Sequence, residues 1–572
     1  MTDNNIKRKF TELKKDLNFR TLTVIILSFL FLAIAFLPLF KPYHRGTADG
    51  LAHKFRLVSF INSLNDGILR PRWLADQAMG FGAPIFMFNY SFPYYAISGI
   101  KYSGFDIRTS VQIFQAATLV FSFIFMYLFI KKLWGSPAGM VAAAVYTYSP
   151  YHLLTIYTYE GWGEFTAFVF PPLILFLLLR FKKNTVSNFL LLTFSWLFFI
   201  LSHNVSVLIY SPVLLIIGTI LLWGKKQTLF YFFCSFFGGI ILSAFFWLPA
   251  ILMNKLTKYP DLIVQEAGMR GTFFKPAIMQ IKTALESIRT VSTYYPDFTA
   301  GLPVLLTVII FPIFYFLTGN REKKLFYLYF LLILCLFLTT PSSRGVWEEM
   351  KIMNYIVYPF RLLAPAAFLG AVLAGFTVIK YKPLGIILLA LAVISGYPFT
   401  QPRVEIFPFN DGYFSQIQTF TSPPGTLKNM ATREFLPKTA SIPILLDVEK
   451  KYTETKVLPE KFDFKQGAQR ISEELRAEKM SITYNSTVPD ILTVNSFYFP
   501  NWQAYIDGQK TKIEADIDGR ITIKVPKGRH RAEFIFGYTA VEKTANLVSL
   551  AGLAGLSGAV LWMTGKLKSG RI

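Results

Sequence analysis

The chain has 572 residues, of which 53% are hydrophobic and 17% aromatic, and its mean hydropathy is positive at +0.42. Soluble domains have a smaller apolar share, so this composition excludes an ordinary soluble protein and predicts a polytopic membrane protein. The 58 Lys and Arg residues outnumber the 34 Asp and Glu residues. They form short clusters between apolar segments, which indicates membrane orientation and excludes nucleic acid as a partner.

Residues 1–20 are basic and precede the first apolar segment, Thr21 to Phe40, which is long enough to cross a bilayer. The basic segment predicts a cytoplasmic amino terminus. Ala33-Ile34-Ala35 resembles a signal-peptidase site, but the apolar run continues beyond it, so the sequence favours an uncleaved anchor. The two cysteines, Cys234 and Cys335, lie inside apolar runs and do not indicate a disulfide framework.

Eleven further apolar segments bring the prediction to about twelve transmembrane helices. They are Val111 to Ile130, Gly139 to Ile156, Glu164 to Leu179, Phe189 to Leu201, Val205 to Trp223, Leu229 to Met253, Leu302 to Leu317, Leu325 to Thr340, Phe360 to Ile379, Leu384 to Tyr397 and Leu547 to Met563. Basic clusters such as Lys131-Lys132 and Lys225-Lys226 all fall on the cytoplasmic side of this topology, which satisfies the positive-inside rule.

The predicted organisation has four parts. A cytoplasmic basic tail (1–20) precedes a transmembrane domain (21–400) with a large first outer loop (41–110). An extracytoplasmic region (401–543) ends in a β domain, and a last transmembrane helix with a basic cytoplasmic tail (544–572) closes the chain. Both termini are therefore expected in the cytoplasm, with the extracytoplasmic segments on the opposite side of the plasma membrane.

The first outer loop carries the densest group of chemistry-bearing residues. Asp49, His53 and Arg56 recur at spacings of four and three, so a short helix would present an acid, an imidazole and a guanidinium on one face. A carboxylate just beyond a membrane helix can act as a general base if partial desolvation raises its basicity. The alternative is that Asp49-Gly50 makes a turn and caps the following helix.

The last outer segment alternates with period two from about Met480 onward. Apolar residues recur at 521, 523 and 525 and again at 532, 534 and 536, and Asp507-Gly508 and Asp518-Gly519 are turn signals. This pattern predicts a small antiparallel β domain that folds as a β-sandwich. Residues 410–476 give no clear pattern apart from a helix predicted near Gln469 to Lys479.

Other outer residues are candidates for the site. Glu160 is a second candidate acid, and His203-Asn204 either positions a substrate or caps a helix. Arg361 lies at the outer start of a span, where an arginine is costly unless it binds a partner, such as a phosphate, or extends to water. Arg70 and Arg289 are further candidates for substrate binding. The histidines show no spacing typical of a metal site, so no metal and no cofactor is predicted.

Several motifs resemble YfhO-like bacterial membrane proteins, which belong to the broad GT-C class of polytopic glycosyltransferases. They are NDGILRPRW (65–73), GFGAPIF (80–86), LSHN (201–204), FWLPA (246–250), YPFR (358–361), FPNWQAYIDG (499–508) and VPKG (525–528), and they span nearly the whole chain. The fold class implied is a GT-C-like, mainly α-helical membrane protein with an extracytoplasmic C-terminal β-sandwich-like domain before the last helix. Many relatives carry an acid after the WLPA run, where this chain has Asn254.

The resemblance implies an enzyme that moves a sugar from a polyprenyl-phosphate carrier to an envelope glycan or lipid acceptor on the outer face. Asp49 takes the place of the catalytic base of that class, and arginines would hold the carrier phosphate. Two other classes of function stay open at this point. A transporter or flippase of lipid-linked glycan would show buried polar residues and broken helices in its spans. A nonenzymatic envelope-assembly protein would depend on its β domain instead.

Overall fold

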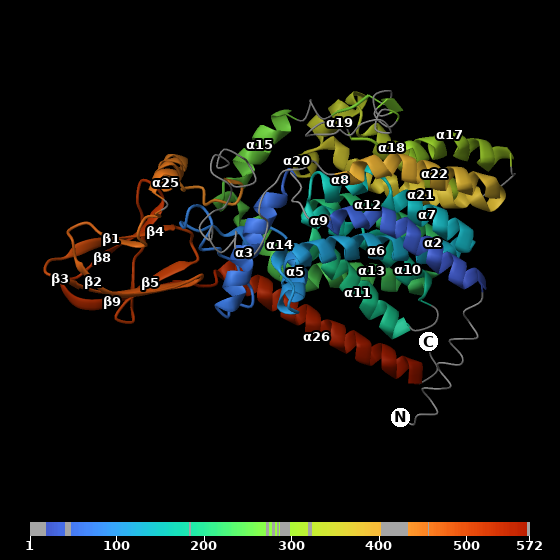
Figure 1. Ribbon diagram of the computed structural model, residues 1–572. Helices are drawn as coiled ribbons and strands as arrows, with labels where there is room; N and C mark the ends of the chain where they lie inside the picture. Colours follow the sequence, from blue (N-terminus) through green and yellow to red (C-terminus); the bar gives the residue numbers. More distant parts are fainter. Residues whose placement is uncertain are drawn as a thin grey trace.

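A computed structural model of the chain describes residues 19–40, 47–181, 185–269, 274–276, 281–282, 285, 298–317, 323–401, 433–455 and 457–568. A helical bundle and a β domain lie at opposite ends of an elongated molecule (Figure 1). The bundle helices are α2 (Phe19–Phe36), α6 (Ile107–Trp134), α7 (Ser136–Thr147), α8 (Pro150–Tyr157), α9 (Trp162–Ala167), α10 (Phe170–Leu179), α11 (Thr185–Ser202), α12 (Asn204–Leu221), α13 (Lys226–Leu242), α14 (Ala244–Met253), α17 (Leu302–Leu317), α18 (Lys323–Phe337), α21 (Leu363–Lys380), α22 (Lys382–Gly396) and α26 (Ala540–Lys568).

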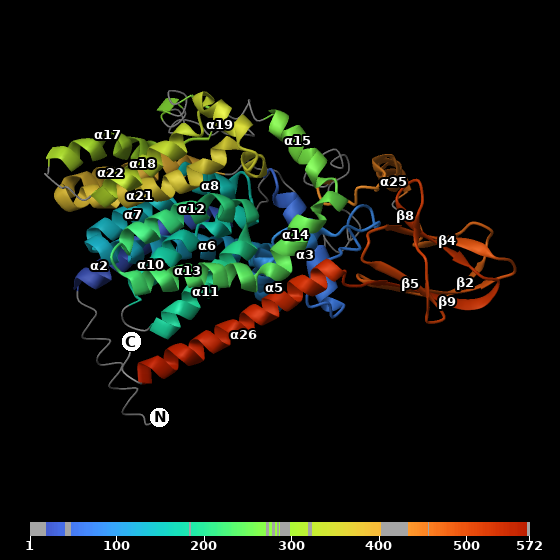
Figure 2. The same ribbon diagram turned by 180° about the vertical axis from the view of Figure 1, so that it is seen from behind.

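Shorter elements surround the end of the bundle that faces the β domain or connect its helices. They are η1 (Leu37–Phe40), α3 (Gly50–Asn65), α4 (Ile85–Phe88), α5 (Phe92–Tyr102), η2 (Asn254–Leu256), α15 (Tyr259–Met269), η4 (Pro341–Ser343), α19 (Arg344–Glu349), α20 (Met353–Ile356), η5 (Pro359–Leu362), η6 (Tyr397–Thr400) and α25 (Ile442–Thr455). Helix α3 lies between the bundle and the β domain in both views (Figures 1 and 2).

The helices make this a membrane protein, but the predicted count of about twelve spans is not confirmed. Six helices of the described residues are long and apolar enough to cross a bilayer, or up to eight if each of two bent pairs counts as one span. The bent pairs are Lys226–Leu242 with Ala244–Leu256, at 62°, and Lys323–Phe337 with Pro341–Glu349, at 94°. The predicted span from Gly139 to Ile156 is also broken, because Pro150 begins a new helix, α8, after α7 ends at Thr147.

Small residues let the central helices of the bundle approach one another. Helix α7 packs against both α6 and α21. A Cβ on Gly139 would lie 2.8 Å from the Tyr127 carbonyl oxygen, so only glycine fits at this contact. The span Pro359–Ile379, which comprises η5 and most of α21, is almost entirely buried. The close packing of these helices supports the residues at the ends of the helices.

The β domain consists of two antiparallel sheets. One has the strand order β1-β4-β8-β7 and the other the order β2-β3-β9-β5-β6. Their bounds are β1 (Phe462–Phe464), β2 (Gln469–Arg476), β3 (Lys479–Ser486), β4 (Asp490–Phe497), β5 (Trp502–Ile506), β6 (Gln509–Thr511), β7 (Glu514–Ala515), β8 (Arg520–Val525) and β9 (Gly528–Phe536).

The predicted alternation is confirmed in the strands. Ile521, Ile523 and Val525 of β8 are buried, and so are Ala532, Phe534 and Phe536 of β9. Across the two sheets, the Phe462 and Phe534 rings lie 6.2 Å apart, so the inner faces pack as a sandwich.

The helix predicted near Gln469 to Lys479 is wrong, because this segment forms β2 and the turn into β3. Its sequence, QRISEELR, is rich in residues that favour helices. All eight residues of β2 are exposed at the edge of a sheet, so no buried face imposes a period of two. Pairing with β3 outweighs local propensity here.

Arg72 joins the segment between α3 and α4 to the β domain and to α26. Its guanidinium donates to Glu478 Oε2 at 2.7 Å and to Glu542 Oε1 at 3.1 Å, and it also binds two backbone carbonyls, those of Phe536 and Gly537. The side chain is almost fully buried, so the ion pairs are shielded from water. From this junction α26 runs back along the bundle (Figure 2).

Candidate functional site

Asp49 lies immediately before the first residue of α3. The backbone N–H groups of Ala48 and Asp49 donate to the carbonyls of Thr158 and Tyr159, both at 3.0 Å, which ties the start of α3 to the turn after α8. Asp49 occupies the N-cap position of α3, but its side chain makes no capping hydrogen bond. The half-buried carboxylate is therefore not used as a helix cap, unlike the alternative considered for the Asp-Gly pair.

The environment of Asp49 raises its basicity. Burial raises the pKa of the carboxyl from 3.8 to about 6, since desolvation disfavours the charged form. The positive charges of Arg56 and Arg361 and a hydrogen bond from Tyr159 oppose this shift. A carboxylate with a pKa near neutrality, beside two guanidinium groups, is suited to accept a proton.

His53 lies one turn along α3, as the spacing predicts, but it is held as a neutral ring. Its Nδ1 and the Tyr94 hydroxyl are 2.6 Å apart, and its Nε2 and the Tyr90 hydroxyl are 3.4 Å apart. The ring stacks on Trp162 with centroids 5.3 Å apart. Burial, with the charge of Arg56, lowers the pKa of His53 to about 3. His53 is thus uncharged at neutral pH and orders the aromatic wall behind Asp49.

Arg56 is also on the same face of α3, and it meets a residue that lies far along the chain. Its Nη2 donates to Glu434 Oε1 at 3.1 Å, and its guanidinium lies 5.6 Å from the centre of the Phe435 ring. The segment that carries both partners is anchored on the chain after α14, where the Lys258 N–H donates to the Leu436 carbonyl at 3.0 Å. Burial raises the pKa of Glu434 to about 7.

Arg361 enters the site from η5, at the start of the most buried span. Its Nη1 donates to the Ile356 carbonyl at 2.8 Å, and its guanidinium lies 5.1 Å from the centre of the Tyr358 ring. Its Nε is buried and has no hydrogen-bond partner among the described residues. The preceding Val357 has φ of +65°, which is strained for a β-branched residue. The strained backbone holds this guanidinium, with its unsatisfied donor, at the site.

Glu160, the second predicted acid, is part of a buried ion pair with Lys54. Its Oε2 accepts from Lys54 Nζ at 2.8 Å and from Thr47 Oγ1 at 2.7 Å. Its Oε1 lies 3.4 Å from two further donors, those of Gln115 and Trp162. Only 1% of the residue is exposed. These contacts give Glu160 a positioning role at the start of α3, so a catalytic role stays only a prediction.

Gly50 is required by the close approach of Glu160, which gives a first testable prediction. A Cβ on Gly50 would lie 1.8 Å from Glu160 Oε2. Gly50→Ala should therefore displace the carboxylate from Lys54 and lower the free energy of unfolding by about 1–3 kcal/mol. Thermal unfolding of the purified chain would measure this loss.

Gly99→Ala is the matched control, because no heavy atom lies within 4 Å of a Cβ added to that helical glycine. Its melting temperature should be equal to or above that of the wild type. If Gly50→Ala melts at the same temperature as Gly99→Ala, the close approach of Glu160 to Gly50 is refuted.

The other predicted site residues lie in different parts of the structure and have different contacts. Arg70 donates to Asn546 Oδ1 at 3.1 Å and to the Phe245 carbonyl at 2.7 Å. These hydrogen bonds connect it with α26 and α14, and not with the Asp49 site. His203 caps α12 by accepting from the Ser206 N–H, and its ring packs edge-on against Tyr90. Asn204 is exposed and donates to the Phe88 carbonyl. Arg289 lies outside the described residues.

Two site partners, Glu434 and Lys54, were not found by sequence reasoning. Glu434 lies in a part of the chain without periodic pattern, and nothing local connects it with Arg56. Lys54 lies beside His53 in α3, but its partner Glu160 has φ of +55°, and such a turn is not readable from the sequence. No group of three or more His, Cys, Asp or Glu side chains that could hold a metal ion occurs in the part of the chain that is described.

Comparisons with known proteins give distant similarities. No protein-family model matches the chain. An uncharacterised protein of Lactococcus lactis subsp. cremoris (strain MG1363) is 26% identical over 313 residues, which cover 52% of this chain and 50% of that protein. The chain therefore spans about half the length of this curated relative.

An oligosaccharyltransferase and an arabinofuranosyltransferase are among the similar solved structures. The apo oligosaccharyltransferase of Archaeoglobus fulgidus is 14% identical, with a TM-score of 0.42, over 71% of this chain and 57% of its own. The mycobacterial arabinofuranosyltransferase AftD is 15% identical, with a TM-score of 0.40, over 68% of this chain and 27% of its own. TM-scores below 0.5 do not establish a common fold, so the functional argument rests on the site residues.

Proposed function

We propose that this protein is a membrane glycosyltransferase that takes a sugar from a polyprenyl-phosphate carrier and passes it to an envelope glycan or lipid acceptor. The observation that carries the proposal is the half-buried Asp49, whose pKa is raised to about 6 and whose carboxylate lies near two guanidinium groups. A base and cations at one end of an apolar bundle suit a reaction between a lipid-linked phosphate and a hydroxyl.

In the proposed step, Asp49 accepts the proton of an acceptor hydroxyl while the oxygen forms a bond to the anomeric carbon of the sugar. The bond between that carbon and the phosphate oxygen breaks, and the polyprenyl phosphate leaves with the electron pair. A direct displacement of this kind inverts the configuration at the anomeric carbon. Glu160 and Lys54 do not take part in the reaction directly. Their ion pair fixes the start of α3 and hence the position of Asp49.

Arg361 is the guanidinium that we assign to the leaving phosphate. Its buried Nε lacks a partner among the described residues, and a planar fork binds phosphate oxygens bidentately. Arg56 is already paired with Glu434, so it acts mainly through its charge. The negative charge that develops on the phosphate oxygen is thereby stabilised when the donor is cleaved.

The proposal is tested by incubating the purified chain in nanodiscs with labelled polyprenyl-phosphate sugars and membrane acceptors, without nucleotide sugar. Label should move to the acceptor. Transfer that occurs only from a nucleotide sugar would contradict the proposed donor class. Absence of transfer from every lipid-linked donor, with movement of lipid-linked glycan between leaflets, would instead support a transporter.

The rate of transfer should depend on the ionisation of Asp49. Since the base must be deprotonated, the rate should be constant above pH 6 and fall about tenfold per pH unit below it. Initial rates in buffers on both sides of pH 6 would measure this. Glu434→Gln should keep the fall in rate at acidic pH, which separates Asp49 from Glu434, whose pKa is also raised. A rate that does not change through pH 6 would remove Asp49 as the base.

The bent helix pairs are the feature that a transporter would share. The first bend, between α13 and α14, has no charged residue in the apolar helix that follows it, AFFWLPAILM. In the second, Arg344 and Glu348 pair with each other and are more than half exposed. Neither bend therefore presents a buried ion site among the described residues.

A further inference from the structure

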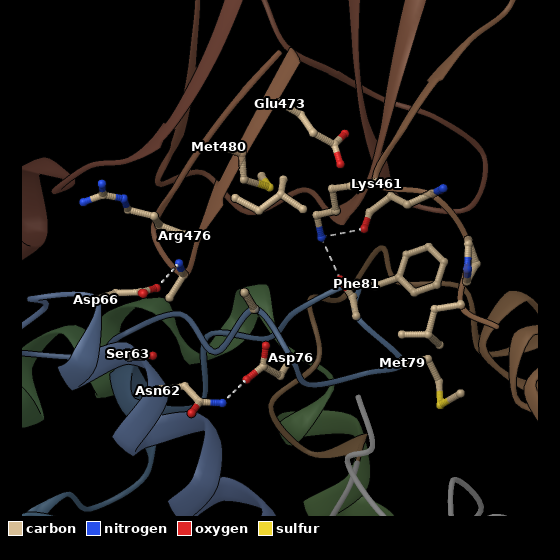
Figure 3. A pocket seen from close by; sticks show the side chains of 17 residues that line it. Asn62, Ser63, Asp66, Asp76, Met79, Phe81, Lys461, Glu473, Arg476 and Met480 are labelled. Carbon is tan, nitrogen blue, oxygen red and sulfur yellow. Dashed lines mark hydrogen bonds between the residues drawn. The ribbon is translucent and has the colours of Figure 1, made fainter. Parts of the chain in front are cut away.

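A polar cleft separates the first outer loop from the β domain. It has a volume of about 300 Å³ and is open on one side. Figure 3 shows Glu473 and Met480 of the β domain on one wall and Asn62, Ser63 and Asp76 on the other.

The cations of the cleft are already engaged. Lys461 Nζ donates to the Gly80 carbonyl at 2.7 Å and to the Asn495 carbonyl at 2.9 Å. Arg476 pairs with Glu474 at 3.0 Å. A phosphate or a carboxylate in the cleft would therefore find no uncommitted cation there and would face acidic side chains.

The acceptors of the cleft are available. Asp76 uses one carboxylate oxygen, Oδ2, to accept from Asn62 Nδ2 at 3.0 Å. Its other oxygen and both oxygens of Glu473 have no hydrogen-bond partner among the described residues. Carboxylate oxygens facing a cleft from opposite walls can each accept hydrogen bonds from the hydroxyl groups of a ligand.

Apolar side chains complete the cleft. Met480 and Phe81 are buried, and Leu475 of β2 borders the opening. Such surfaces suit the C–H face of a sugar ring, while the carboxylates bind its hydroxyls. At about 300 Å³ the cleft is at the lower end of ligand sites and would hold roughly one or two sugar residues.

The cleft is separated from Asp49 by the length of one helix. Asp49 precedes α3, whereas Asn62 and Ser63 belong to its last turn. A helix of 16 residues is about 24 Å long. A ligand that reaches both places must therefore be an extended chain.

We propose that this cleft binds a neutral sugar residue of a polymeric acceptor, several residues away from the hydroxyl that reacts at Asp49. The binding of a neutral sugar follows from the cleft alone. Its assignment to the acceptor rests on the proposed function.

The test is the binding of the full chain in nanodiscs to immobilised oligosaccharides of graded length, in neutral, anionic and free-amine forms. Neutral oligosaccharides should bind best. The double variant Asp76→Asn with Glu473→Ala should bind them at least tenfold more weakly. Asp463→Ala, an exposed carboxylate of β1 outside the cleft, is the matched control and should bind like the wild type.

Three results would overturn the inference: no neutral oligosaccharide binds at millimolar concentration, the double variant binds as tightly as the wild type, or charged glycans bind better than neutral ones. Glu473 is exposed, so Glu473→Ala alone is a second variant that will fold if the double variant does not.

Asp49→Asn separates this inference from the proposed function. The variant should keep its glycan binding while it loses transfer. If transfer is unchanged in Asp49→Asn, the proposed function fails, whereas the binding measurement still decides whether the cleft holds a neutral sugar. In an active chain, the cleft variants should raise KM for a long acceptor and leave KM for a single-sugar acceptor unchanged.

Discussion

Asp49→Asn is expected to lower the rate of sugar transfer by roughly 100- to 10,000-fold, because the amide cannot accept the proton of the acceptor hydroxyl. Asparagine has nearly the same shape, and the wild-type carboxylate makes no capping hydrogen bond, so folding should be retained. The measurement is kcat for transfer with saturating donor, at a pH above 6 and at matched protein concentration.

Two further variants make the result specific. Asp49→Glu should recover part of the activity, because it restores a carboxylate at a slightly different distance. Asp463→Asn removes an exposed carboxylate of the β domain and should leave kcat unchanged. A kcat for Asp49→Asn equal to that of Asp463→Asn would exclude Asp49 from the chemistry.

Arg361→Gln is expected to lower kcat by roughly 100- to 1,000-fold, because the charge that develops on the leaving phosphate would lose its guanidinium. Arg361→Lys should recover less than full activity, since an ammonium keeps the charge but cannot bind two phosphate oxygens as a planar fork. Both variants would be measured with saturating and limiting lipid-linked donor.

The control for Arg361 is Arg344→Gln, which removes an exposed arginine whose one ion-pair partner among the described residues is Glu348. It should keep the activity of the wild type. Because Arg361 also binds the Ile356 carbonyl, thermal unfolding should accompany the kinetics. If Arg361→Gln loses activity only in proportion to its loss of folded protein, the assignment of Arg361 to the phosphate is wrong.

Part of this architecture was predictable because local patterns carried it. The spacing of Asp49, His53 and Arg56 predicts a common helix face, and α3 places His53 and Arg56 side by side with Asp49 at its start. Period-two alternation in β8 and β9 predicts the buried faces of the sandwich. In both cases the period of the side chains matches the period of the backbone.

Other features depend on contacts between distant parts of the chain. Glu434 lies 378 residues from Arg56, and no local pattern marks it as a partner. The contacts of the Glu160 carboxylate with Lys54 and Thr47 are likewise not marked by any local pattern. The exposed strand β2 was predicted as a helix because an edge strand without a buried face leaves no alternation in the sequence.

The partners of Arg70 are also set by contacts between distant parts of the chain. A guanidinium in an outer loop can bind a phosphate or a backbone carbonyl, and sequence alone does not distinguish the two. The structure places Arg70 on the Phe245 carbonyl and on Asn546 of α26. Arg361, in contrast, retains a buried donor without a partner among the described residues. Tertiary packing, and not residue type, decides which arginine remains available.

The proposed reaction cleaves a lipid-linked sugar donor with Asp49 as the base. The most direct measurement is a single-turnover reaction of the purified chain with a labelled polyprenyl-phosphate sugar and acceptor, in which released polyprenyl phosphate and transferred sugar are both quantified. The wild type should release one polyprenyl phosphate for each sugar transferred, and Asp49→Asn should release almost none in the same time. Equal release by the two proteins, or transfer without release of polyprenyl phosphate, would contradict the account.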